Sequence, residues 1–73
     1  MKYTRNYVVP NFQSLERFYW IITHHEKCRH CFFNGNHKFS LGDVDNRYKV
    51  NVESTIKSEL EFLEGVAYQM NHL

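Results

Sequence analysis

The sequence predicts a small α+β domain of order β-α-β-β-α, with a short, mainly antiparallel sheet and two amphipathic helices on one face. Three observations predict it: an alternating, strand-favouring N-terminal segment, two segments with apolar residues at helical spacing, and Asn34-Gly35 between them. An all-helical chain is the alternative. Because 73 residues have room for one hydrophobic core, residues 1–73 are expected to form one domain.

The first part of the chain predicts a strand followed by a helix. Tyr3–Val9 alternates between two sets of side chains and is rich in strand-favouring residues. Pro10 ends strand pairing and Asn11 is a favourable N-cap, so a helix is expected to begin at Phe12 and to end near Lys27. Its core face is expected to consist of Phe12, Leu15, Phe18, Tyr19 and Ile22.

The middle of the chain predicts a hairpin. Asn34-Gly35 favours a two-residue reversal, which divides His30–Leu41 into two short strands. Residues 42–46 are interpreted as a polar loop. The next apolar residues either extend the sheet or lead into the last helix: Tyr48, Val50 and Val52.

A second helix is expected from about Asn51 or Val52 toward the C-terminus, with Glu53 near its start. Its solvated face is expected to carry Glu59, Glu61 and Glu64. Its apolar residues form two adjacent stripes, the first of Ile56, Leu60, Leu63, Ala67 and Met70 and the second of Phe62, Val66 and Leu73. Two such stripes, with Gly65 between them, predict a homodimer.

Composition restricts the setting and the partners. The N-terminus has no apolar signal region, and the longest apolar run, Phe18–Ile22, is too short to cross a bilayer, so a cytoplasmic protein without membrane contact is expected. Residues 1–50 carry eight Lys/Arg and four Asp/Glu, whereas residues 51–73 carry one Lys and four Glu. This polarity is too mild to imitate DNA or to bind it by charge alone.

A possible metal site lies between Thr23 and His37, which hold both cysteines and four histidines. Cys28 and Cys31 are spaced to share a tetrahedral ion, and thiolate with imidazole favours structural zinc. The predicted ligands are Cys28, Cys31, His37 and one of His24 or His25. The alternative is that the thiols are reduced and partly buried and that the histidines are ordinary surface groups.

A possible partner-binding surface lies on the first helix, away from its core face. Trp20 and Ile21 are expected there beside Arg17 and His24, and an exposed Trp next to an Arg is typical of a protein interface. The alternative is that a second layer of the fold covers them. No catalytic constellation is present, so we expect a non-enzymatic protein that docks on a larger one, of the kind that phages and mobile elements encode as inhibitors or regulators.

Nucleic-acid binding is the other class of function that the sequence allows. Basic residues with interleaved aromatic residues can contact phosphates and stack on bases. The candidates are Arg5, Arg17, Lys27, Arg29, Lys38, Arg47 and Lys49, with Tyr3, Tyr7, Trp20 and Tyr48.

Overall fold

The computed structural model describes residues 1–41 and 44–72, and for residues 41 and 44–46 it describes the backbone alone. The elements follow the order β1-α1-η1-β2-β3-α2, where η1 is a single 3₁₀ turn. Their bounds are β1 (Tyr3–Val9), α1 (Phe12–His24), η1 (Glu26–Cys28), β2 (Cys31–Leu41), β3 (Val44–Ser54) and α2 (Lys57–Asn71).

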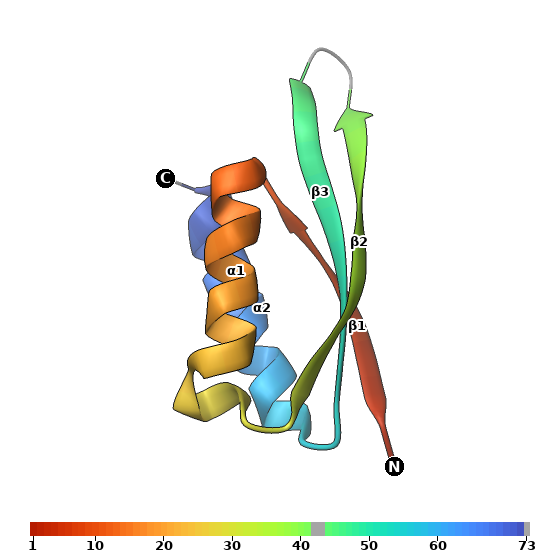
Figure 1. Ribbon diagram of the computed structural model, residues 1–73, viewed down its shortest axis with the longest axis vertical. Helices are drawn as coiled ribbons and strands as arrows, with labels where there is room; N and C mark the ends of the chain where they lie inside the picture. The colour runs from red at the N-terminus through yellow and green to blue at the C-terminus, as the bar shows by residue number, and fades with distance from the viewer. Residues whose placement is uncertain (42–43, 73) are drawn as a thin grey trace.

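The three strands form one sheet of order β1-β3-β2, in which β3 is antiparallel to both neighbours. β1 and β2 are therefore parallel to each other with β3 between them, which is a split β-α-β unit. Both helices cover one face of this sheet, α1 beside β2 and α2 beside β1, and none of the described elements covers the opposite face (Figure 1). The predicted α+β fold with two helices on one face is confirmed.

The start of α1 is also as predicted, because the Asn11 side chain caps it. Asn11 Oδ1 accepts a hydrogen bond from the Ser14 backbone N–H at 2.8 Å. The helix ends at His24, three residues before the expected Lys27. His25 is extended and its Nδ1 accepts from the Lys27 backbone N–H at 3.0 Å, which starts η1.

The predicted hairpin turn at Asn34-Gly35 is wrong. β2 continues through both residues, and its pairing with β3 shifts between Phe33 and Gly35, so Asn34 is the extra residue of a β-bulge. Gly35 has a φ of +149°, which favours glycine, and Asn34 Nδ2 donates to Asn51 Oδ1 and to Glu53 Oε1, both at 2.9 Å. Pairing along a whole strand outweighs the local preference of this dipeptide for a turn.

The chain instead reverses between Leu41 and Val44, which pair with each other across residues 42–43. The predicted loop over residues 42–46 is therefore too long, since residues 44–46 already belong to β3, while residues 42–43 lie outside the described part. α2 starts at Lys57 and not at Asn51 or Val52, so Glu53 lies in β3.

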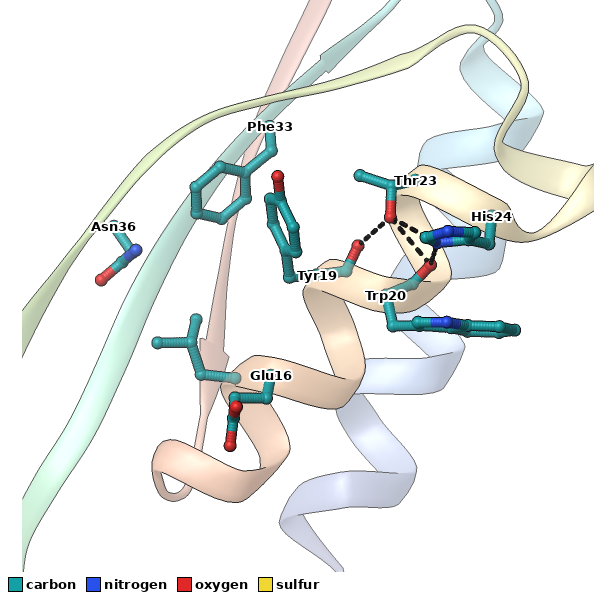
Figure 2. Close-up of a pocket in the computed structure, with 8 residues that line it drawn as sticks. Glu16, Tyr19, Trp20, Thr23, His24, Phe33 and Asn36 are labelled. Atoms are coloured by element: carbon teal, nitrogen blue, oxygen red, sulfur yellow. Dashed lines mark hydrogen bonds between the residues drawn. The ribbon is translucent and has the colours of Figure 1, made fainter.

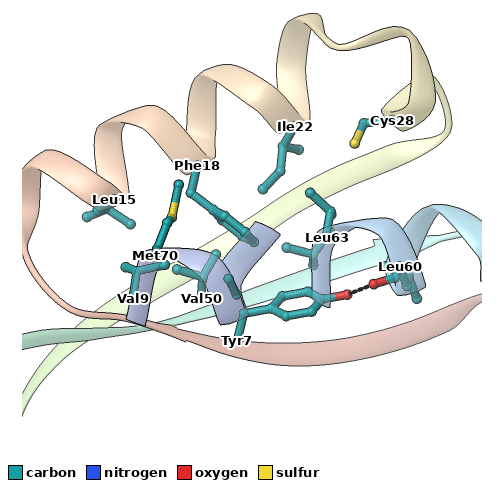
Figure 3. Packing of buried hydrophobic residues seen from close by; sticks show 12 residues of the cluster. Tyr7, Val9, Leu15, Phe18, Ile22, Cys28, Val50, Leu60, Leu63 and Met70 are labelled. Carbon is teal, nitrogen blue, oxygen red and sulfur yellow. Dashed lines mark hydrogen bonds between the residues drawn. The ribbon is translucent and has the colours of Figure 1, made fainter. Parts of the chain in front are cut away.

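Val50, Val52 and Ser54 alternate along the helix-facing side of β3 and are each at most 1% exposed. A segment that buries every second residue under two helices is stabilised as a central strand. Phe18 of α1 and Leu60 and Leu63 of α2 pack over this side and are fully buried (Figure 3). The Tyr7 hydroxyl crosses the same layer and donates to the Leu60 carbonyl at 2.6 Å.

Two residues of the expected core face of α1 are exposed. Phe12 is 57% exposed and meets the Tyr48 ring edge-on, and Tyr19 is 49% exposed and meets the Phe33 ring edge-on. A sheet of three strands is narrow, and it covers only the middle of the apolar face that the sequence predicts for α1. The buried residues of that face are Leu15, Phe18 and Ile22.

None of the helices in the described part of the chain is long and apolar enough to span a bilayer.

Candidate functional site

A groove of about 410 Å³ lies between the outer side of α1 and β2 (Figure 2). This volume falls within the roughly 300 to 1,000 Å³ of typical ligand pockets. Aromatic and aliphatic side chains supply most of its wall, and a few polar groups interrupt them. The lining residues are Leu15, Glu16, Tyr19, Trp20, Thr23, His24, Phe33 and Asn36.

The bulge in β2 builds one wall of this groove. Phe33 and Asn36 are three positions apart, so in a regular strand their side chains would point to opposite faces. The extra residue Asn34 shifts the alternation of side chains by one position. Phe33 therefore lies opposite Val52 and Asn36 opposite Val50, both on the helix-facing side. The bulge thus brings Phe33 and Asn36 to the same side, opposite α1.

Trp20 is 57% exposed, and its ring is held in place by a neighbour on the same helix. The His24 ring stacks on it with centroids 4.8 Å apart and planes 10° apart. His24 Nδ1 lies 3.1 Å from the Trp20 carbonyl oxygen and 2.8 Å from Thr23 Oγ1. The indole therefore presents a fixed, largely exposed apolar surface.

The residues predicted to contact a partner are divided among three places. Trp20 and His24 line the groove. Ile21 is half-buried and packs against the core, so the expectation that it points away from the core is corrected. Arg17 is exposed but lines a different hollow, between the start of α1 and the end of α2.

Only part of the predicted zinc set lies together: one hollow is lined by His24, His25, Cys28 and Cys31, and His37 lies apart from it. Cys28 and Cys31 are neighbours: burial has the larger effect on the pKa of Cys28 and raises it, although the Cys31 thiol lowers it. His37 lies six residues beyond Cys31 on the same strand, about 17 Å away at five steps of the ladder, because the expected reversal is a bulge. His24 faces Trp20, and His25 packs on the Phe62 ring at 4.8 Å.

Among the residues that the structure describes, no group of three or more His, Cys, Asp or Glu side chains is placed to hold a metal ion. Zinc thus stays a prediction from the sequence. Elemental analysis of protein purified without a chelator decides it.

Both thiols are unfavourable nucleophiles. Burial raises the pKa of Cys28 above its ordinary value and raises the pKa of Cys31 to about 12. Thiol chemistry requires the thiolate, which is scarce at neutral pH for such groups.

We expect iodoacetamide at pH 7.5 to modify Cys28 much more slowly in the native protein than in urea, because Cys28 is 2% exposed and its thiol stays protonated. Mass spectrometry of quenched samples gives both rates. Equal native and denatured rates would contradict the buried thiol. A small free thiol in the same buffers controls for the intrinsic effect of urea.

Glu59 connects three elements, although the sequence placed it on a solvated face. Its side chain is only 11% exposed. Oε1 accepts from the His30 backbone N–H at 3.0 Å and from Ser54 Oγ at 3.1 Å, with Cys31 Sγ at 3.6 Å, and Oε2 lies 3.0 Å from His30 Nδ1. This carboxylate therefore ties the start of β2 and the end of β3 to the first turn of α2.

The pKa of Glu59 is lowered. Burial alone would raise the pKa, but the hydrogen bonds from the His30 ring, the His30 N–H, Ser54 and Cys31 together outweigh it. Because the Glu59 carboxylate already accepts hydrogen bonds from these donors, its role is to hold the neighbouring elements together. One signal in the sequence could have suggested it: an acidic residue three positions after Ile56, in the first turn of a helix.

The predicted nucleic-acid contacts are spread over the molecule. Arg5 pairs with Glu64 at 2.6 Å, and Lys27 lies over the Phe62 ring at 5.4 Å. In the register of β2 with β3, Lys38 lies opposite Tyr48, on the face of the sheet that the helices cover. Lys49 lies on the other face. Tyr7 is buried. The basic residues that can be placed in this way thus lie over different elements and faces.

The apolar stripes that predicted a homodimer are used within the chain. Leu60, Leu63, Ala67 and Met70 are buried, and Phe62 and Val66 pack against the same core. Ile56 is the N-cap of α2 and 40% exposed, and Leu73 lies outside the described residues. Gly65 is exposed, with nothing within 4 Å of an added Cβ.

Comparisons with protein-family models, with curated proteins and with solved structures find no match to this chain.

Proposed function

We propose that this protein is a non-enzymatic binding module that docks on a larger protein through the α1 groove and thereby alters or blocks it. One observation carries the proposal: Trp20 is 57% exposed and fixed beside an apolar groove, although the core is complete without it. Trp is enriched among the few residues that supply most of the binding energy of protein interfaces.

The arrangement around Trp20 favours binding in two further ways. The stack on His24 restrains the indole before any partner arrives, which lowers the entropy that is lost on association. Tyr19 adds a second exposed ring, 49% accessible, that is held edge-on against Phe33 at 5.0 Å. A fixed apolar centre with polar neighbours such as Glu16, Thr23 and Asn36 is the usual arrangement of an interface.

The chemistry of Cys28, Cys31 and Glu59 supports binding over catalysis. The raised thiol pKa values oppose nucleophilic attack by Cys28 or Cys31. Glu59, whose Oε1 lies 3.6 Å from Cys31 Sγ, already accepts hydrogen bonds from His30, Ser54 and Cys31. We therefore assign Cys28, Cys31 and Glu59 a structural role and not a catalytic one.

We expect Trp20→Ala to lose at least about 2 kcal/mol of binding free energy, which is about 30-fold in Kd. The partner is first captured from extract on the wild-type protein and identified by mass spectrometry, and its affinity for each variant is then measured. Tyr68→Ala is the matched control, because Tyr68 is 63% exposed and stacks on His72, the C-cap of α2, but lies on α2 and not on α1. Equal affinities for wild type and Trp20→Ala would reject the groove as the docking site.

A further inference from the structure

We infer that the partner inserts an arginine side chain into the α1 groove, with its guanidinium between the Trp20 ring and the Glu16 carboxylate. The inference rests on the proposed function and names the residue type that the groove recognises. Three observations carry it: the charge of the groove, the uncovered face of the Trp20 ring, and the spacing of Glu16, Trp20 and His24 along α1.

The charge of the groove favours a cation. Glu16 is exposed and lines the groove, and none of the other described lining residues is an aspartate, a glutamate, a lysine or an arginine. Glu16 forms neither a hydrogen bond nor an ion pair with another described residue. The adjacent cation of the same helix, Arg17, lines a different hollow. A partner group that enters the groove therefore meets an unpaired carboxylate, which attracts a cation and repels an anion.

The Trp20 ring has one covered face. His24, one turn further along α1, covers the face that points toward the end of the helix, and the planes of the two rings are 10° apart (Figure 2). Among the described residues, Trp20 has no ring contact besides this one. Since 57% of Trp20 is exposed, its exposed surface lies on the opposite face and along the ring edges. A cation placed over the face of an indole is attracted by its π electrons.

The uncovered face of Trp20 points toward Glu16. Glu16, Trp20 and His24 follow one another at intervals of four residues, so they lie on one side of α1. Each interval corresponds to about 6 Å along the helix axis. His24 covers Trp20 from one direction, and Glu16 lies one turn away in the other. A guanidinium on the uncovered face of the indole therefore comes within reach of the Glu16 carboxylate, and both groups attract the same cation.

The shape of the groove favours arginine over lysine. A guanidinium is planar and weakly hydrated, so it can stack on a flat ring and donate two hydrogen bonds to one carboxylate. Tyr19 lies three positions after Glu16, so its ring borders the same turn of α1. That ring is 49% exposed and is held edge-on by Phe33. The apolar stem of an arginine can pack on it while the guanidinium reaches Trp20 and Glu16.

The probes are capped tripeptides in which the central residue, between two alanines, is arginine, citrulline, lysine or norleucine. Citrulline has the shape of arginine without its charge. Trp20 is the sole tryptophan, so its indole N–H gives a single signal in NMR spectra of the isotope-labelled protein, and this signal reports binding at the groove. We expect the arginine peptide to shift the signal saturably and to bind at least about fivefold more tightly than each of the other three.

A substitution at Glu16 tests the role of the carboxylate. Glu16→Gln should weaken the arginine peptide at least about threefold and leave the citrulline peptide unchanged. Glu61→Gln is the matched control and should change neither affinity, because Glu61 is exposed but lies on α2 and lines another hollow. Urea unfolding of both variants should match that of the wild type, since both positions are exposed. The preference for arginine over citrulline should shrink as salt is added.

Four results would overturn the inference. These are equal affinities of the arginine and citrulline peptides, equal affinities of wild type and Glu16→Gln for the arginine peptide, tighter binding of the lysine peptide, and an indole signal that none of the peptides shifts. A doubled sedimenting mass of the chain alone, abolished by Glu16→Gln, would overturn it in favour of an arginine from a second copy.

None of these outcomes decides the proposed function, which depends on the affinity of the captured partner for Trp20→Ala. If Trp20→Ala loses that partner while the arginine and citrulline peptides bind equally, the docking site stands and the arginine is rejected. If Trp20→Ala keeps the partner, the proposed function fails whatever the peptides show.

Discussion

Phe18→Ala should destabilise the protein by about 3 to 5 kcal/mol. Phe18 is 0% exposed, lies between the sheet and both helices, and meets the Tyr7 ring at 5.4 Å (Figure 3). Alanine removes the whole ring and leaves a cavity that rigid neighbours fill only in part. A chain of 73 residues has roughly 4 to 11 kcal/mol of total stability. Urea unfolding followed by circular dichroism measures the loss.

Phe12→Ala is the control on the same helix. Phe12 is 57% exposed and has an edge-on contact with Tyr48, so its loss should cost about 1 kcal/mol. Similar losses for the two variants would contradict the burial pattern of α1 and restore the broad core face that the sequence predicts.

Glu59→Ala should cost about 1 to 3 kcal/mol, because it leaves the His30 N–H without its acceptor and leaves the Ser54 hydroxyl with the Ile56 carbonyl alone, at 3.1 Å. Glu61→Ala, two residues along the same helix at an exposed position, should change stability by less than about 0.5 kcal/mol. Equal effects of the two substitutions would show that Glu59 is an ordinary surface residue.

The contribution of Glu59 should also depend on pH. Its pKa is lower in the folded state than in the unfolded chain, so the folded state holds its proton less tightly. The stabilisation is therefore fully present above the unfolded pKa, about 4.3, and is lost as pH falls through the folded value. The difference in unfolding free energy between wild type and Glu59→Gln should shrink below about pH 4. A constant difference from pH 6 to pH 2.5 would contradict the lowered pKa.

Local signals in the sequence predict much of the fold. The alternation of Tyr3–Val9 and the Asn11 cap depend on neighbouring residues alone, and both are confirmed. The conformation of Asn34-Gly35 and the position at which α2 starts depend instead on which strand lies opposite. Pairing with β3 over eleven residues turns the expected reversal into a bulge and keeps Val50 and Val52 in a central strand.

The residues of the candidate site likewise fall into those that local spacing predicts and those that depend on long-range contacts. Helical spacing places Trp20 and His24 off the core face of α1, and the structure places both at the groove. Asn36 lies on the same side of β2 as Phe33 only because Asn34 is an extra residue, and Glu59 meets His30 across 29 positions of sequence. Neither arrangement has a local signature.

The unfolding free energy of Trp20→Ala tests the central claim that Trp20 belongs to a docking surface and not to the core. With 57% of Trp20 exposed and its ring stacked on His24, we expect a loss of about 1 kcal/mol or less in urea unfolding. A loss of about 3 to 5 kcal/mol, as for Phe18→Ala, would mean that the indole is a structural core group and would contradict the proposed function.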